Sequence, residues 1–247
     1  MTLPVHWVES LAGVRPGDLV EVEGDEAHHA VAVRRLREGE PLALTDGTGT
    51  TLVGLVHETG KRRLTVEVGE VVRVPEPEPR VTVVQALPKG DRGELAVELL
   101  TEIGVATVVP WAAARSVAVW RGDRAEKSLG RWRATAREAA KQSRRSWFPL
   151  VVPLVTTQEV CDVVARADLA VVLHEGAAQA LASMPVPERG SMVVVVGPEG
   201  GLTHDEVEAF ADAGARAVRL GDEVLRTSTA GVAAVASLLA RTGRWAT

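Results

Sequence analysis

Two glycine-bearing loops follow apolar runs in the C-terminal half of the chain, and both have the composition of a small-molecule site. The run Val193–Val196 leads directly into Gly197-Pro198-Glu199-Gly200-Gly201, and a later run ends at Leu220, just before Gly221. Ligands of open α/β sheets lie beyond the carboxyl ends of the strands, where glycine lets the backbone approach them closely. The alternative for each loop is a tight turn that requires a positive φ.

The second loop continues through Val224-Leu225-Arg226-Thr227-Ser228-Thr229-Ala230-Gly231 into an alanine-rich stretch. Its hydroxyl run predicts that Thr227 or Ser228 caps a helix. A third loop, His174-Glu175-Gly176, follows the apolar run Leu169–Leu173, and three loops at one edge of a sheet predict a pocket. The first loop lacks the Gly-x-Gly-x-x-Gly spacing of dinucleotide-binding folds and the Lys-Ser/Thr pair of a P-loop, so neither of those ligand classes is supported.

Basic residues are concentrated in one segment. The 247 residues carry a formal net charge of −5, yet Arg115–Arg145 holds ten basic and three acidic residues, a net of +7, which leaves −12 for the remainder. Leu129 and Trp132 begin an apolar stripe at helical spacing, while Arg137 and Lys141 lie on another face. An ordinary solvated face is the alternative, but such helices intersperse glutamates with their basic residues. The excess charge therefore favours a phosphate-binding surface.

Alternating prolines mark a linker over residues 74–80 and divide the chain into two predicted domains, 1–73 and 81–247. The first domain has four predicted strands and one predicted helix, which suggest a small β-barrel that closes its own edges. The strands are Leu19–Glu23, Pro41–Thr45, Thr51–Val56 and Leu64–Val72, and the helix is Asp25–Leu36.

After the linker, apolar strands alternate with helices, which predicts an α/β domain with a mainly parallel sheet. The predicted strands are Val81–Leu87, Thr107–Pro110, Leu169–Leu173, Met192–Val196 and Ala217–Leu220. The predicted helices are Arg92–Ile103, Arg124–Arg145, Gln158–Ala165, Asp205–Ala213 and Thr229–Arg241. Thr203 and Glu206 have the spacing of a capping box, and Gly214 is placed to end the same helix.

Several function classes lose support from the sequence. The single cysteine, Cys161, cannot form an internal disulfide and fits a reducing cytoplasm, and no apolar run approaches the length of a membrane span. We expect no metal site at His28-His29, because adjacent histidines on a helix point to different faces. The sequence offers no convincing catalytic triad, because Gly-x-Ser-x-Gly is absent and Cys161 lies in a predicted helix without a signalled histidine partner.

An ordered set of short motifs resembles one family over almost the whole chain. The motifs are His28-His29 with Val33-Arg34-Arg35, Asp46-Gly47, Lys89-Gly90-Asp91-Arg92, Glu102-Ile103-Gly104-Val105, Arg115-Ser116, Glu138-Ala139-Ala140 with Gln142-Ser143, Arg145 and Pro149, Gly197-Pro198-Glu199-Gly200-Gly201, and Leu225-Arg226-Thr227 with Thr229-Ala230. Together they resemble the small-subunit (16S) ribosomal RNA uridine-N3 methyltransferases of the SPOUT class. The resemblance implies a PUA-like N-terminal barrel, a C-terminal domain with a deep trefoil knot, and a homodimer.

The resemblance also implies that S-adenosylmethionine is the cofactor and that 16S ribosomal RNA or the small ribosomal subunit is the partner. Its cofactor-binding residues would be Leu173, His174, Glu175, Gly176, Gly197, Pro198, Glu199, Gly200, Gly201, Leu220, Gly221, Leu225, Thr227, Thr229 and Ala230. Arg35, Arg115 and Arg145 match family arginines and would face RNA; the basic helix adds Arg137 and Lys141 to that surface. The family commonly has Glu at the position of Ser228 and Lys at that of Leu99, so Ser228 receives no catalytic role.

Methyl transfer to N3 of uridine needs alignment of the reactants and loss of the N3 proton. Arg226, by its motif position, is the candidate catalytic residue, because a nearby cation stabilises negative charge developing on uracil. Two alternatives stay open at the level of sequence. One is a non-catalytic RNA-binding or ribosome-assembly factor with a vestigial cofactor pocket. The other is a nucleotide-binding α/β enzyme unrelated to RNA.

Overall fold

The computed structural model describes residues 3–246, which form two compact units. The N-terminal unit contains the described residues up to Glu76 together with Ala140–Phe148. The C-terminal unit contains Pro77–Ala139 and the described residues from Pro149 onward. The return of Ala140–Phe148 to the N-terminal unit joins residues that are far apart in the sequence.

The N-terminal unit is built on a five-stranded sheet in the order β1-β3-β4-β5-β2. Its strands are β1 (Val5–Trp7), β2 (Leu19–Glu23), β3 (Pro41–Thr45), β4 (Thr50–Thr59) and β5 (Arg63–Arg73). β1 pairs in parallel with β3, and the other neighbours are antiparallel. Within residues 3–246, β1 and β2 are the two edge strands and do not pair with each other, and the sheet packs against a leucine- and valine-rich core. The sheet therefore agrees with the expected barrel in part.

The helix predicted over Asp25–Leu36 is shorter and changes its winding. Helix α1 (Gly24–His28) continues as the π-helix η1 (His29–Val33), and the buried Ala27 and Ala30 face the core of the unit. Arg35 then takes a φ of 58°, and a right-handed helix cannot continue through a residue with this φ. The helical segment therefore ends at an arginine doublet, Arg34-Arg35.

The segment Ala140–Phe148, which we call the strap, is hydrogen-bonded to the turn between β3 and β4. The amide of Gly49 donates to Ser146 O at 2.8 Å, and the amide of Phe148 donates to Gly47 O at 2.8 Å. A Cβ on Gly47 would lie 2.8 Å from the Phe148 ring, and one on Gly49 would lie 2.7 Å from the Trp147 ring. Glycine at these two positions lets the aromatic side chains pack directly on the turn.

The C-terminal unit contains a six-stranded sheet in the order β11-β9-β10-β6-β7-β8, with every neighbouring pair parallel. The strands are β6 (Arg80–Ala86), β7 (Thr107–Trp111), β8 (Leu150–Val151), β9 (Leu169–Leu173), β10 (Ser191–Val196) and β11 (Arg216–Val218). Alternate strand residues enter two separate cores, so both faces of the sheet are buried. This confirms the predicted parallel α/β sheet.

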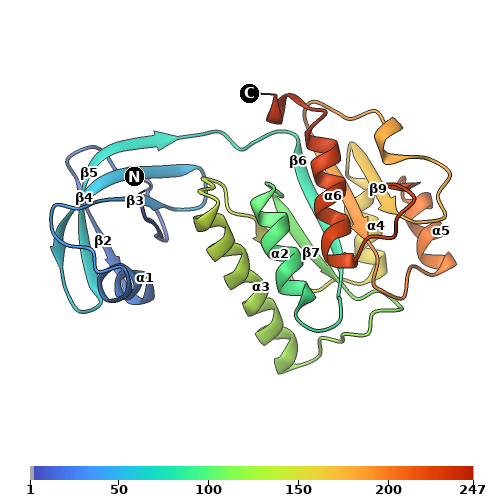
Figure 1. Cartoon of the computed structure of the whole chain (residues 1–247), viewed down its shortest axis with the longest axis horizontal. Coiled ribbons are helices and arrows are strands. Elements are labelled where there is room, and N and C mark those ends of the chain that lie inside the picture. The colour runs from blue at the N-terminus through green and yellow to red at the C-terminus, as the bar shows by residue number, and fades with distance from the viewer. Residues whose placement is uncertain (1–2, 247) are drawn as a thin grey trace. The chain divides into compact units, whose positions relative to one another are not determined.

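Helices cover the two faces of this sheet (Figure 1). They are α2 (Arg92–Glu102), α3 (Asp123–Gln142), α4 (Thr157–Ala165), α5 (His204–Asp212) and α6 (Thr227–Leu239), with 3₁₀ turns at η2 (Leu181–Ser183) and η3 (Gly243–Trp245). Helices α2, α3 and α6 contribute to one core, while α4 and α5 contribute to the other. The capping box of Thr203 and Glu206 is confirmed, as is the positive φ of Gly214.

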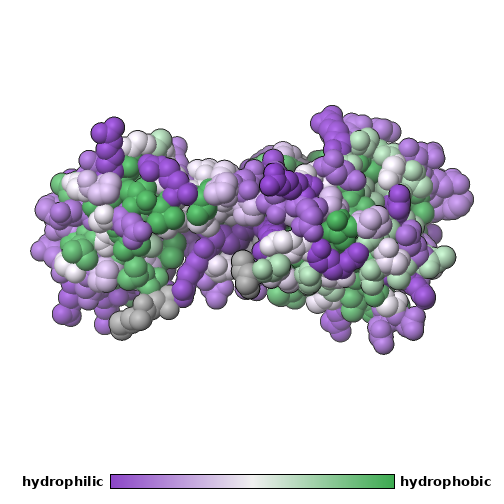
Figure 2. All heavy atoms as spheres, turned by 90° about the horizontal axis from the view of Figure 1, so that it is seen from above, coloured by the Kyte–Doolittle hydropathy of each residue, from purple (hydrophilic) through white to green (hydrophobic). Residues whose placement is uncertain are grey.

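Helix α3 ends at Gln142, three residues before the predicted end at Arg145. Arg144, within the strap, takes a φ of 55°, which turns the chain away from the direction of the helix. Figure 2 shows hydrophilic and hydrophobic residues interspersed over the face in view. None of the helices formed by residues 3–246 has both the length and the apolarity needed to cross a membrane.

Candidate active site

A cavity of about 710 Å³ opens in the C-terminal unit at the carboxyl ends of β9, β10 and β11. These are the strand ends at which the sequence predicts a pocket, and all three predicted loops line it. Its apolar walls include Leu173, Val196, Val218 and Leu220, and the backbone of the glycine-rich loop forms another side. A volume of this size suits a ligand of a few tens of heavy atoms.

The loop after β10 is held by its own turn and by an arginine. The amide of Gly201, with φ 71°, donates to Pro198 O at 2.9 Å, and the chain then enters the capping box of α5. From outside the loop, Nη1 of Arg115 donates to the carbonyls of Gly200 (3.3 Å) and Leu202 (3.1 Å). Arg115 therefore fixes the loop that forms one wall of the cavity, a role that sequence reasoning did not assign to it.

The loop after β11 leads into α6 through a hydroxyl network. Arg226, not Thr227 or Ser228, is the N-cap residue of α6, and no side chain caps this helix. Thr227 Oγ1 instead donates to Gly197 O at 2.8 Å and accepts from Gln85 Nε2 at 3.0 Å. The predicted cap is wrong because the hydroxyl of Thr227 is engaged by the neighbouring strand ends.

Charged side chains of both signs surround the cavity. The cations are Arg92, Arg115, Arg219 and Arg226, and the anions are Glu175, Glu199, Asp222 and Glu223. Two of the anions have partners: Glu199 accepts from the amide of Lys89 at 3.2 Å, and Asp222 lies 3.3 Å from Nη1 of Arg219. The cavity can therefore receive a ligand that carries both positive and negative groups.

Most of the cofactor-binding residues predicted from sequence line this one cavity, and two do not. The lining set is Leu173, His174, Glu175, Gly197, Pro198, Glu199, Gly200, Gly201, Leu220, Gly221, Leu225, Thr227 and Ala230, together with the candidate catalytic Arg226. Gly176 lies outside the lining, where its amide donates to His174 Nδ1. Thr229 also lies outside, and its hydroxyl donates to the carbonyl of Arg226 within the first turn of α6.

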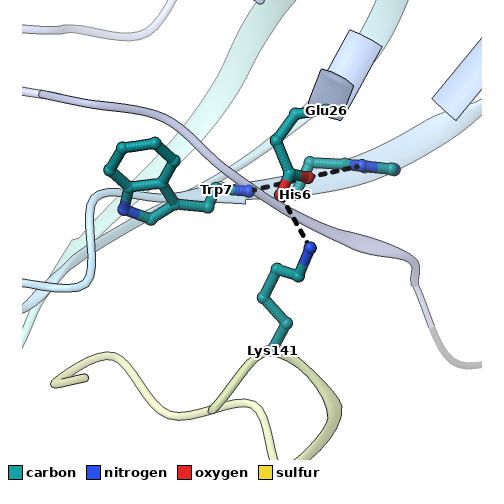
Figure 3. Close-up of polar contacts among 4 residues, drawn as sticks. All are labelled: His6, Trp7, Glu26 and Lys141. Carbon is teal, nitrogen blue, oxygen red and sulfur yellow. Dashed lines mark hydrogen bonds and ion pairs between the residues drawn. The ribbon is translucent and has the colours of Figure 1, made fainter. Parts of the chain in front are cut away.

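The predicted RNA-facing residues do not share one environment. Arg35 and Arg137 are exposed, and Arg145 is half-buried. Lys141 does not fit the expectation, because its side chain is 8% exposed and its Nζ lies 2.7 Å from Glu26 Oε1 (Figure 3). A buried lysine that is already paired with a carboxylate cannot also neutralise a phosphate, so we remove Lys141 from the proposed RNA surface.

Sequence reasoning missed Gln85 and Arg92. Gln85 is fully buried near the end of β6. In the sequence it is a polar residue within a mainly apolar run, and its partner Thr227 is 142 residues away. Arg92 lines the cavity from the start of α2. A buried polar side chain in the central strand of a parallel sheet is itself a signal, because it requires a hydrogen-bond partner.

The sequence matches two family models that together cover most of the chain. Residues 75–239 match the RNA methyltransferase domain, and residues 22–69 match the RNA methyltransferase PUA domain. The chain belongs to the RNA methyltransferase family. Within this family, it is 47% identical to ribosomal RNA small subunit methyltransferase E of Mycobacterium tuberculosis, over 99% of this chain and 94% of that protein. The Bacillus subtilis protein of the same name is 32% identical, over 88% of each chain.

Two solved structures share the fold of this chain. Ribosomal RNA small subunit methyltransferase E from Neisseria gonorrhoeae, solved with bound S-adenosyl methionine, matches with a TM-score of 0.88 and 28% identity, covering 99% of this chain and all of that one. A methyltransferase from Legionella pneumophila with bound cofactor matches in fold with a TM-score of 0.89 at 24% identity, covering 98% and 99% of the two chains. Both domains of this chain therefore have the family fold.

Proposed function

We propose that this protein is an S-adenosylmethionine-dependent methyltransferase that modifies N3 of a specific uridine in small-subunit ribosomal RNA. The observation that carries the proposal is the cavity formed by three loops at the carboxyl ends of β9, β10 and β11. The three loops that line this cavity contain the motifs from which the sequence predicts cofactor binding. The chain is also 47% identical to a ribosomal RNA small subunit methyltransferase E.

The residues of the cavity fit S-adenosylmethionine. Leu173, Val196 and Leu220 offer an apolar wall of the kind that an adenine ring needs, and the glycine-rich loop offers backbone groups. The acidic Glu175 and Glu199 suit the cationic ammonium and sulfonium groups, while the arginines suit the carboxylate. Bound there, the cofactor supplies an electrophilic methyl group. The chain's own contribution is to hold donor and acceptor in one geometry, which is worth about 7–11 kcal/mol in favourable cases.

Arg226 is the proposed catalytic residue. Its guanidinium is exposed at the cavity, and its backbone is fixed because its carbonyl accepts the amides of Thr229 and Ala230 in the first turn of α6. When N3 of uracil loses its proton, negative charge spreads over the ring and its two carbonyl oxygens. A cation positioned beside these atoms lowers the free energy of the charged ring, so the N3 proton can pass to solvent water without a strong base from the protein.

RNA binding is assigned to basic residues of both units, taken separately. Arg35 and Arg145 belong to the N-terminal unit, and Arg137 lies on the exposed face of α3. Arg115 lies at the rim of the cavity, where its charge adds to that of Arg226. Each phosphate that such residues neutralise releases counterions from RNA and strengthens binding.

Three further properties follow from the family resemblance and belong to the same proposal. They are a deep trefoil knot in the C-terminal unit, assembly as a homodimer, and a cytoplasmic location. The loops after β10 and β11 that line the cavity are the segments that the knot would involve. Sedimentation of the purified protein tests the homodimer directly.

Nucleoside mass spectrometry of small-subunit ribosomal RNA tests the proposed reaction. We expect 3-methyluridine in RNA from cells that contain the protein and its loss when the gene is deleted. Purified protein with S-adenosylmethionine should restore the nucleoside in small subunits from the deletion strain. Unchanged 3-methyluridine in the deletion strain would overturn the assignment. Loss without restoration, combined with no calorimetric binding of S-adenosylmethionine, would favour a non-catalytic assembly factor.

A further inference from the structure

Among residues 3–246, the two non-glycine residues with positive φ are both arginines, and each belongs to an arginine doublet. Arg35 (φ 58°) follows Arg34, and Arg144 (φ 55°) precedes Arg145. A left-handed backbone is unfavourable for a residue with a Cβ and persists only where surrounding structure imposes it. Such residues gather at ligand clamps more often than elsewhere. Both doublets belong to the N-terminal unit.

Each doublet follows the end of a helical segment, and one ion pair connects the two segments. Glu26 lies in α1, which continues through η1 to Arg34, and Lys141 lies in the last turn of α3, just before Arg144. Glu26 Oε1 accepts from Lys141 Nζ at 2.7 Å (Figure 3). This ion pair therefore links the two helical segments that precede the doublets.

This ion pair is buried. The Lys141 side chain is 8% exposed and that of Glu26 is 15% exposed. Around Glu26, His6 Nδ1 lies 3.4 Å from Oε2, and the amide of Trp7 donates to the same oxygen at 3.4 Å. Desolvation makes such pairs weak contributors to stability, and the best-attested reason to retain one is that it selects a single geometry.

The far end of the strap has its own anchors. Trp147 Nε1 donates to Val74 O at 3.0 Å, and Trp147 pairs with Thr48 in an antiparallel bridge. With Lys141 fixed at one end and Trp147 at the other, the residues between them have little freedom. Arg144 lies in this interval and is exposed, as are Arg34 and Arg35 in the other doublet.

We propose that the buried Glu26–Lys141 pair is a positioning device that holds Arg34-Arg35 and Arg144-Arg145 as one binding surface for RNA phosphates. The inference rests on the proposed function and extends it. It adds Arg34 and Arg144 to the RNA surface and gives Lys141 an indirect role. The exposed guanidinium groups of Arg34, Arg35 and Arg144 suit a phosphate backbone, because a guanidinium group can bind two phosphate oxygens at once.

The test measures RNA affinity as a function of salt, using a transcript of the organism's own small-subunit ribosomal RNA. Arg35→Gly and Arg144→Gly each remove a charge at a position where glycine tolerates the positive φ. We expect each variant to bind the transcript several-fold more weakly and to lower the slope of log affinity against log salt by about 1. An unchanged slope in both variants would overturn the proposed surface.

The positioning role is tested with Glu26→Gln/Lys141→Met, which replaces the buried pair without leaving either charge unpaired. We expect the double variant to fold, to bind S-adenosylmethionine as the original protein does, and to lose about tenfold in RNA affinity with a lower salt slope. Asp25→Asn is the matched control, because Asp25 is next to Glu26 but forms an exposed pair with Arg62. A double variant with full RNA affinity and salt slope would refute the positioning role. If the original protein binds neither transcript nor small subunit at low salt, the proposed function fails instead.

Discussion

Gln85 and Thr227 hold together the two loops that form the walls of the cavity. Gln85 Nε2 donates to Thr227 Oγ1 at 3.0 Å, and the same hydroxyl donates to Gly197 O at 2.8 Å. Gln85 is the penultimate residue of β6, Thr227 begins α6 and Gly197 follows β10, so one hydroxyl joins three elements. Because Gln85 and Thr227 are both buried, water cannot replace either bond without rearrangement.

Thr227→Val should weaken binding of S-adenosylmethionine about tenfold. Valine keeps the shape of threonine but removes the hydroxyl that accepts from Gln85 Nε2 and donates to the Gly197 carbonyl. Gln85 Nε2 keeps its bond to Ala86 O, and the two lost bonds cost about 1–3 kcal/mol of unfolding free energy. The lost bond also frees the loop after β10 from the start of α6. Isothermal titration calorimetry measures the affinity, and urea denaturation measures the stability.

Thr229→Val is the control for this substitution. The hydroxyl of Thr229, two residues after Thr227, donates to the carbonyl of Arg226 within α6, and Thr229 is outside the cavity lining. The loss of a single local bond there should change cofactor affinity less than twofold. Equal effects of the two substitutions would show that the Gln85–Thr227 network does not set the cavity geometry.

Arg115→Leu should reduce cofactor affinity even when no RNA is present. Nη1 of Arg115 donates to the carbonyls of Gly200 and Leu202, and both residues line the cavity. A leucine covers the same surface but cannot donate, so the loop loses its restraint. Calorimetry with S-adenosylmethionine alone separates this role from RNA contact. Full cofactor affinity with weakened RNA binding would show that Arg115 contacts RNA but does not restrain the loop.

Much of the sheet could be predicted from sequence, because local patterns determine it. The bounds of β2, β3 and β9 agree with the prediction, since each is an apolar or alternating run between turn residues. Strands β1 and β8 were missed because runs of three and two residues carry no periodicity. Their pairing partners are provided by distant parts of the chain.

The contacts within the N-terminal unit could not be predicted from local patterns. Glu26 and Lys141 are 115 residues apart, and a surface lysine on a basic helix has the same sequence signature as a buried one. No glycine or proline stands at the end of α3 to indicate where the helix stops. Arg144, two residues beyond that end, has the left-handed conformation that glycine usually adopts there. When two charged residues pair over a long sequence separation, the sequence around each residue does not indicate its partner.

Glu26 should make the stability of the protein depend on pH below about 4.5. Burial raises the pKa of Glu26, but contacts with His6 and Lys141 outweigh it and lower that pKa from 4.5 to about 2. A carboxyl group with a depressed pKa in the folded state contributes stability above its unfolded pKa and loses it as the pH falls through the folded value. This contribution is present in full above pH about 5 and is lost progressively toward pH 2.

Urea denaturation between pH 3 and about pH 6 measures this dependence. Glu26→Gln should lower the unfolding free energy at pH 6 and flatten its fall toward pH 3, because the titrating group is gone. His6, Lys141 and His29 are the charged or titratable groups around it and remain in the variant. Asp25→Asn, at an exposed neighbouring carboxylate, should leave the pH profile as it is. A Glu26→Gln profile parallel to that of the original protein would contradict the assignment.

Arg226→Ala should slow methyl transfer while leaving cofactor binding within about threefold of the original. The guanidinium stabilises charge that exists only as N3 of uracil loses its proton, so its removal acts on the chemical step and should cost about 10²-fold or more. Single-turnover methylation with saturating cofactor and small subunits measures that step without product release. Arg216→Ala is the matched control, because Arg216 is an exposed arginine on β11 outside the cavity lining. If Arg226→Ala and Arg216→Ala react at the same rate, Arg226 has no part in the chemistry.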